Sequence, residues 1–375
     1  MNCRLLQVPP CDSEESEEDR TMPAHLHAAP GCNQKSGCPC STTTCAHPAC
    51  LKGGPLLDCQ EMLDGRFYCF HRDYDGTDVL PDDFKPSASP KTETYEKWVA
   101  RFTGRNPNTL MAARWNAIKL IHAFARRTNA PAMPKIRRRD VELGLRLRVE
   151  SPGDICQGDR NLCAPAALLT SYCSADPVGY VKYVIGVYEY GYGFIGKIKV
   201  APCSDFLQEA PPKSSGMIPP VDWIALGGLR NSENKLLDYR ADSWFEGFRG
   251  GTSFEQLKDW FDRAGFTKVK AEEFKSPSII EVARVNDLLE ARYQVILSVS
   301  NNLVTENFAS EGKQDHAVVL RSRIEVGNDA PNYSVKFTVS SGGQWNTPVP
   351  SSEGKGVLSF TAFRRNFFGY IAGKF

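Results

Sequence analysis

A cysteine that begins a helix and a distant histidine are the residues of this sequence best suited to chemistry. Cys163 lies in the stretch QGDRNLCAPAALL, where a small, apolar, helix-forming run follows the cysteine directly. Because the positive end of a helix dipole stabilises a thiolate, this position predicts a lowered thiol pKa and a nucleophilic sulfur. Asp159 or Asn161 could cap the helix, and Pro165 is tolerable only within its first turn.

A cysteine nucleophile needs a base within hydrogen-bond reach, and histidine is the usual one. The sequence contains six histidines, of which four lie in a Cys-rich N-terminal segment or at its edge. A fifth, His122, lies inside a basic helical stretch, and the last, His316, opens the strand-like run HAVVL. We therefore predict that His316 is the base that acts on Cys163.

Together with Gln157, this pair resembles the papain-like cysteine peptidases. The resemblance rests on a glutamine shortly before the nucleophile, a cysteine that begins a long helix, and a HAV-type histidine that opens a strand. It implies a thiolate–imidazolium pair formed by Cys163 and His316. It also implies that the Gln157 amide and the Cys163 backbone N–H donate hydrogen bonds to the oxyanion formed during acyl transfer. The resemblance covers residues 150 to 375.

Within that group, the sequence is more similar to the compact papain-like toxin or effector domains that bacteria deliver into rivals or hosts. The similarity is carried by the stretches NLCAPAALL, DHAVVL, VDWIALGGLRNSEN and LKDWFDRAGF. It implies a secreted cysteine protease for interbacterial competition or host attack, with a protein or peptide substrate. Such a toxin would also require a cognate immunity or inhibitor protein.

The group that would orient the histidine departs from the family pattern. Papain-like enzymes use an Asn or Asp at the end of the next strand, whereas the matching stretch here is TVSSGGQWN. Ser340 is the best positional match, and Ser341, Gln344 and Asn346 are its rivals. Asp315 is a poor candidate, because neighbouring residues on a strand point to opposite faces. Either a serine, a glutamine or a backbone carbonyl holds the imidazole, or the enzyme works as a Cys-His dyad.

Other functions are compatible with the same residues. Within the same fold the thioester could be resolved by a side-chain deamidase, an acyltransferase or a peptidoglycan amidase. A different class is an inactive papain-like domain used for binding, and the unusual TVSSGGQWN stretch is the best support for it.

The elements that must hold these residues follow the order helices first, sheet second. Proline at the first position and Gly191 just past the end predict a helix over 177–190. Two capping boxes, Thr252 with Glu255 and Ser278 with Glu281, predict the next two helices. Period-two patterns then predict strands over 293–299, 316–324, 332–340 and 356–360, followed by FFGYIAG. This order predicts an α+β fold, in which a papain-like helical lobe faces an antiparallel β lobe.

The cysteine distribution marks a boundary ahead of that domain. Nine of the 13 cysteines fall in the first 69 residues. We predict three parts: a Cys-rich irregular segment over 1–90, a basic helical segment over 91–150 that serves as an adaptor or prodomain, and the catalytic domain over 151–375. Disulfides, zinc or free thiols are all conceivable in the first part. The zinc alternative would draw on Cys32, Cys38, Cys40, Cys45, His47 and Cys50.

Composition restricts the remaining function classes. The formal net charge of +1 over 375 residues gives no electrostatic reason for binding nucleic acid or a membrane. Thirteen Lys or Arg lie between Lys97 and Arg148, which we interpret as a solvated face. Six acidic residues crowd the first twenty positions, so we expect no cleavable signal peptide. The chain is expected to be cytoplasmic in its producer, to reach a target cell by specialised secretion, and to need no cofactor or metal for catalysis.

Overall fold

The computed structural model describes residues 107–158, 160–212, 218–233, 252–310, 312–327, 333–351 and 357–375. It also describes the backbone of a small antiparallel sheet near the N-terminus, with the order β1-β3-β2. Its strands are β1 (His27–Ala28), β2 (Leu56–Glu61) and β3 (Phe67–His71). The candidate zinc ligands in the Cys-rich segment lie outside the described residues.

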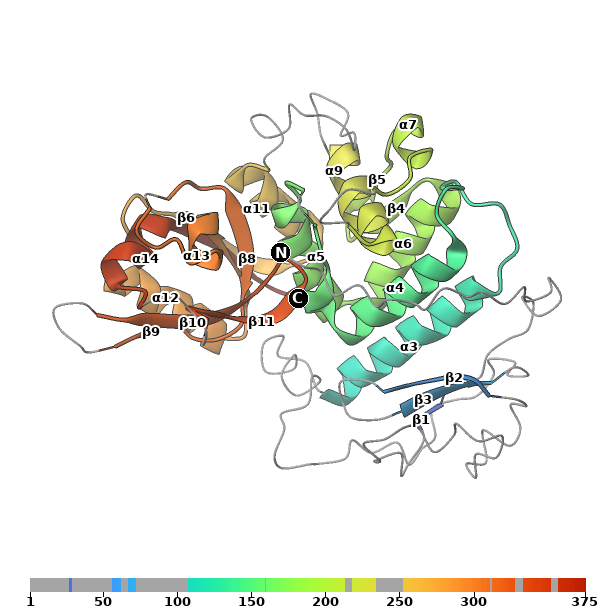
Figure 1. The fold of residues 1–375 in the computed structure, drawn as a ribbon, viewed down its shortest axis with the longest axis horizontal. Helices are drawn as coiled ribbons and strands as arrows, with labels where there is room; N and C mark the ends of the chain where they lie inside the picture. The colour runs from blue at the N-terminus through green and yellow to red at the C-terminus, as the bar shows by residue number, and fades with distance from the viewer. Residues whose placement is uncertain are drawn as a thin grey trace.

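Helices gather in one half of the molecule, on the right of Figure 1. The four long helices there are α3 (Pro107–Ala125), α4 (Arg138–Glu150), α5 (Cys163–Ala175) and α6 (Pro177–Tyr190). Shorter elements complete this half: η3 (Pro152–Asp154), α7 (Ser204–Leu207), α8 (Pro220–Asp222), the π-helical turn η4 (Trp223–Gly227), α9 (Gly228–Glu233) and α11 (Phe254–Arg263). A hairpin of β4 (Gly193–Ile195) and β5 (Ile198–Val200) packs against α6.

A seven-stranded antiparallel sheet forms the other half and curls into a half-barrel (Figure 1). The order along it is β11-β10-β8-β7-β12-β6, and β9 pairs with β10. The strands are β6 (Thr267–Glu273), β7 (Gln294–Val299), β8 (His316–Leu320), β9 (Glu325–Val326), β10 (Val335–Ser341), β11 (Gln344–Val349) and β12 (Phe367–Lys374). The helices of this half are α12 (Ile279–Glu290), α13 (Asn301–Val304) and α14 (Phe360–Asn366).

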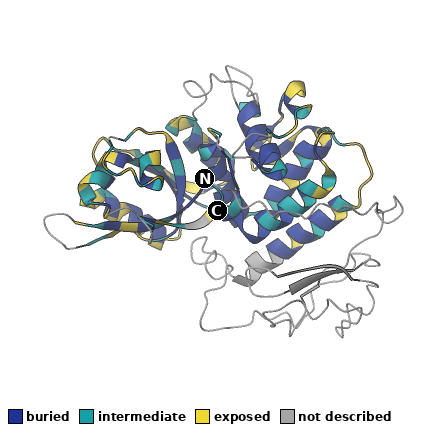
Figure 2. Ribbon diagram, viewed as in Figure 1, coloured by how far each residue is buried: buried dark blue, intermediate teal, exposed yellow. Residues whose placement is uncertain are grey.

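Two hydrophobic clusters meet across the sheet. The first unites the helical half with one face of the sheet, through Ile296, Val319 and Ile371. The second packs α12 and α14 against the other face, which includes Val318 and Leu320. Successive residues of β8 contribute alternately to the two clusters, because neighbouring residues on a strand point to opposite faces. Figure 2 shows the resulting buried layer along α5, which lies between the two halves and packs against β8.

The predicted α+β class is confirmed, and so is the helix over Pro177–Tyr190. Asp176 caps its start by accepting from Gly179 N–H, and Gly191 ends it in the left-handed conformation. The capping box of Ser278 and Glu281 is also present.

Two local predictions were wrong. The α11 helix is capped by Ser253 and not by Thr252. Of the strand predicted over 356–360, the described residues 357–360 form only an isolated bridge between Ser359 and Ser334, because the Ser359 hydroxyl accepts a hydrogen bond from Ala362 N–H and caps α14.

Helices α3 and α4 belong to the same hydrophobic core as α5 and α6. The described part of the basic segment over 91–150 is therefore packed onto the remainder of the chain. Arg114, Arg146 and Arg148 are buried there, so the interpretation of a solvated basic face was wrong for these three residues. In the described part of the chain, no helix has both the length and the apolar character needed to cross a bilayer.

Candidate active site

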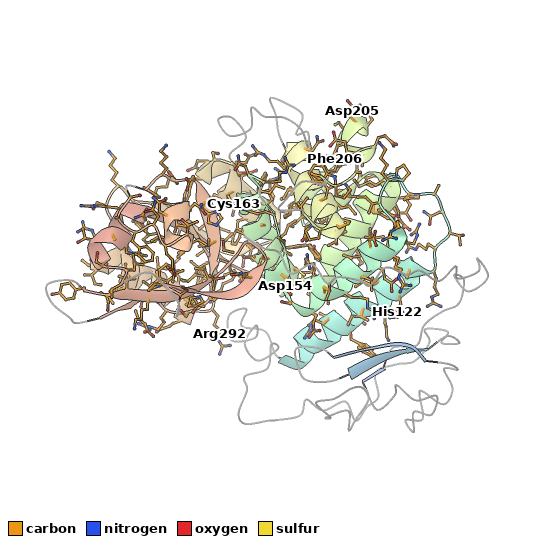
Figure 3. The ribbon with its side chains drawn as sticks, viewed as in Figure 1. His122, Asp154, Cys163, Asp205, Phe206 and Arg292 are labelled. Carbon is orange, nitrogen blue, oxygen red and sulfur yellow. The ribbon has the colours of Figure 1, made fainter. Side chains whose placement is uncertain are left out.

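Cys163 is the first residue of α5, at the end of the helix that faces the sheet (Figure 3). The N-cap residue is Leu162, and no side chain caps the helix there. The N–H groups of Cys163 and Ala164 lie in the first turn, where a helix provides no acceptor for them, and Pro165 in the same turn carries no N–H. The backbone N–H groups of Ala317 in β8, Ala164 and Cys163 form hydrogen bonds with the thiol, which favour its ionised form.

Three distant segments converge on a small cavity around this thiol. Cys163, His316 and Gln157 all line it, together with Ser340 and Ser341. The Cys163 sulfur lies 3.9 Å from the carbonyl oxygen of Asp315, the residue directly before the histidine. His316 is the first residue of β8 and is 8% exposed. The structure thus brings together the three residues on which the sequence prediction depends.

The loop that carries Gln157 is fixed from several sides. The Thr170 hydroxyl of α5 donates to Pro152 O at 3.3 Å, and the Ser340 hydroxyl of β10 lies 3.5 Å from Gly153 O. The backbone N–H of Cys156 donates to the Asp222 carboxylate at 2.9 Å. Gln157 itself is buried against the cavity.

A tight turn joins β10 to β11 beside this loop. Gly342 and Gly343 form it with φ values of 58° and 80°, a left-handed pair that two-residue hairpin turns favour. The carbonyl oxygen of Gly342 lies 3.7 Å from the Cys156 sulfur. A side chain at Gly343 would place its Cβ only 2.8 Å from Cys156 Cβ, so glycine is needed here for close approach.

The hydrogen-bond partner of the histidine is Ser341 and not Ser340. Nε2 of His316 lies 2.9 Å from the Ser341 hydroxyl oxygen. Ser340 instead donates to backbone carbonyls, of Gln344 at 3.2 Å and of Gly153. Ser340 pairs with Val319 in the sheet, and the register of β10 against β11 shifts between Val339 and Ser341. The structure therefore selects one of the rivals that the sequence left open.

The other proposed partners of the histidine have different roles. Asp315 accepts a hydrogen bond from the Asn301 backbone N–H at 2.8 Å, so its carboxylate caps α13. This agrees with the expectation that Asp315 points away from the imidazole. Gln344 accepts from the Thr347 hydroxyl at 3.2 Å. The side chain of Asn346 lies outside the described residues.

Burial favours the neutral forms of both the Cys163 thiol and the His316 imidazole. It raises the pKa of the Cys163 thiol, although the backbone N–H groups of Ala317, Ala164 and Cys163 oppose the rise. Burial also lowers the pKa of His316 to about 4, against the opposing charge of Asp315. The predicted lowering of the thiol pKa by the helix was therefore wrong for this state, because desolvation outweighs the amide dipoles.

This burial makes folding stability depend on pH. The ordinary histidine pKa is about 6.5, whereas that of His316 in the folded protein is about 4. Between these values the unfolded chain binds a proton that the folded chain does not, so the unfolding free energy falls as the pH drops. The expected loss at His316 is about 3 kcal/mol. Urea unfolding across this pH range measures it, and the His316→Asn variant should lack this component. Parallel pH curves for the two proteins would contradict the prediction.

The other described cysteines do not line this cavity. Cys173 is buried and free, and Cys203 is free with intermediate exposure. Cys156 is disulfide-bonded. Among the described residues, no group of three or more His, Cys, Asp or Glu side chains is arranged to hold a metal ion.

Comparison with known proteins returned no match of any kind. No family model, no curated protein and no solved structure matches this chain.

Proposed function

We propose that this chain is a papain-like thiol hydrolase that acts on amide bonds, with peptide bonds of a protein as its substrate class. The observation that supports it most directly is the shared cavity of Cys163, His316 and Gln157. In the proposal Cys163 is the nucleophile, His316 the base and then the acid, and Gln157 a donor to the oxyanion. Ser341 is the group that holds the imidazole.

The neutral resting state defines the first step. The thiol proton passes to His316 as the sulfur bonds to the carbonyl carbon, and the carbonyl oxygen becomes an oxyanion. Gln157 and the first amides of α5 would then donate to that oxygen. His316 gives its proton to the leaving amine as the C–N bond breaks, which leaves a thioester. Water cleaves the thioester, with His316 taking its proton, and the thiol is restored.

The biological setting that we propose comes from the sequence resemblance alone. Similarity to bacterial toxin or effector domains favours a protein of a target cell as the substrate and an immunity protein as the natural inhibitor. A deamidase, an acyltransferase and an amidase share the thioester step. They differ only in the substrate that donates the acyl group and in the molecule that accepts it from the thioester.

An activated ester tests the proposed chemistry without knowledge of the natural substrate. With p-nitrophenyl acetate in the absence of added thiol, we expect a burst of p-nitrophenolate and an acetyl thioester on Cys163, identified by peptide mass spectrometry. The free thiols of Cys173 and Cys203 serve as internal controls. Acetylation of Cys203 in preference to Cys163 would contradict the proposal.

A binding domain without catalysis is the second candidate. One observation favours it: burial keeps the thiol and the imidazole neutral, which is not the ion pair of an activated cysteine. The same ester experiment decides, because a binding domain forms no acyl-enzyme.

A further inference from the structure

The buried ion pair of Arg148 and Asp222 lies directly behind the loop that carries Gln157. Both side chains are almost completely buried, and Asp222 is 0% exposed. Arg148 Nε donates to the two carboxylate oxygens of Asp222 at 3.0 and 3.2 Å, and Nη2 adds a further hydrogen bond. Arg148 belongs to α4 and Asp222 is the last residue of α8, so the pair joins two elements that are far apart in the sequence.

The same carboxylate holds the backbone of the active-site loop. Its Oδ2 atom accepts the N–H of Cys156 at 2.9 Å, one residue before Gln157. A backbone amide fixed at this point restricts where the next side chain can lie. We propose that Asp222, held by Arg148, is a positioning residue that fixes the Gln157 amide for the oxyanion; this inference rests on the proposed function.

The energetics of the pair favour a role beyond stability. Burying a carboxylate and a guanidinium removes both from water, and replacing such a pair by apolar residues is often neutral or stabilising. Burial raises the pKa of Asp222, while Arg148 and the Cys156 N–H oppose the rise. A buried charge is an expensive way to add stability, but a carboxylate with two oxygens can accept from the arginine and a loop amide together.

The test compares two double variants, both of which remove the two charges of the Arg148–Asp222 pair. Arg148→Met/Asp222→Leu removes both charges and the acceptor of the Cys156 N–H. Arg148→Met/Asp222→Asn removes both charges but keeps an oxygen that can accept this N–H. We expect the leucine form to acylate Cys163 with p-nitrophenyl acetate about 10- to 100-fold more slowly than wild type. The asparagine form should recover most of that loss.

The alkylation rate of the same thiol is the control for the acylation rate. A general structural defect would change both rates, whereas loss of the oxyanion donor would change only acylation. Iodoacetamide reacts at a saturated carbon and forms no oxyanion, so its rate at Cys163 should be the same in both double variants and wild type. Glu189→Gln is the matched control, because Glu189 on α6 is a buried carboxylate that binds Arg127 and Arg138 and does not line the cavity. This substitution should lower the melting temperature and leave the acylation and alkylation rates of Cys163 unchanged.

A double-mutant cycle links the effect to Gln157. Gln157→Ala alone should slow acylation about 100-fold, and adding the leucine double variant should cause no further loss. If the leucine form fails to fold, the single variant Asp222→Asn replaces it. In that variant an amide NH₂ group replaces one of the two carboxylate oxygens that accept from Arg148 and the Cys156 N–H, so acylation should slow selectively.

The possible failures are distinguishable. Equal slowing of acylation and alkylation, an asparagine form no better than the leucine form, or an additive loss with Gln157→Ala would overturn the positioning role. Absence of any acyl-enzyme on Cys163 in the wild-type chain would overturn the proposed function itself.

Discussion

Replacing Cys163 by alanine is expected to lower p-nitrophenyl acetate turnover by about 10,000-fold or more, since removal of a nucleophile leaves only background reactivity. Cys163 is the first residue of α5 and only half buried, and alanine is a strong helix former, so the fold should survive. Burst kinetics with mass spectrometry measure the loss, and circular dichroism checks the fold.

Cys203→Ala is the matched control for this change. Cys203 is also free and of intermediate exposure, but it does not line the cavity. Its replacement should leave the burst unchanged. A Cys163→Ala protein that still forms the acyl-enzyme, or that loses no activity against a cellular target, would point to another nucleophile or to a binding domain.

The second large effect is expected at His316. Among the described residues that line the cavity, His316 alone has a side chain suited to accept the thiol proton, and we expect His316→Ala to slow acylation at neutral pH about 1,000-fold. Because the Cys163 pKa is raised, the loss should shrink as the pH rises and the thiol ionises by itself. A pH–rate profile of acylation measures this. A loss that is constant over the whole pH range would show that His316 does not act as the base.

Variants of Ser340 and Ser341 test which serine holds the imidazole of His316. Ser341→Ala removes the hydrogen bond to Nε2 but leaves the base in place, so acylation should fall about tenfold with a shifted acidic limb of the profile. Ser340→Ala should leave the position of that limb unchanged, since Ser340 contacts backbone carbonyls only. A shift of the limb in Ser340→Ala alone would reverse the assignment.

Cys163 and His316 could be predicted as residues of one site because each begins an element with a strong local signal. Cys163 begins an apolar helical run, and His316 opens an apolar strand. These patterns fix the ends of elements, and in α+β folds the ends of elements often carry the chemistry. The confirmed fold class follows from the same periodicities.

The partner of the histidine could not be chosen because that choice depends on register between strands. Ser340 and Ser341 differ by one position, and a one-residue shift moves a side chain to the opposite face. The register of β10 shifts between Val339 and Ser341, so alternation along the sequence does not decide between the two serines. Only the folded structure shows that the Ser341 hydroxyl reaches Nε2 of His316.

Burial was the second property beyond the reach of sequence patterns. The helix start predicted an acidic thiol, but the sheet that packs against α5 removes water from Cys163 and reverses the direction of the pKa change. Asp222 was missed for a similar reason. Nothing near it in the sequence connects it with Cys156, and the contact exists only because α8 folds against the active-site loop.

The glycine at position 343 sets a limit on how this protein could be redesigned. The chain passes Cys156 there with main-chain atoms alone, so substitutions at this site cannot supply new contacts to a ligand without displacing Cys156. Any attempt to retarget the molecule would have to diversify other walls of the cavity and leave Gly343 unchanged.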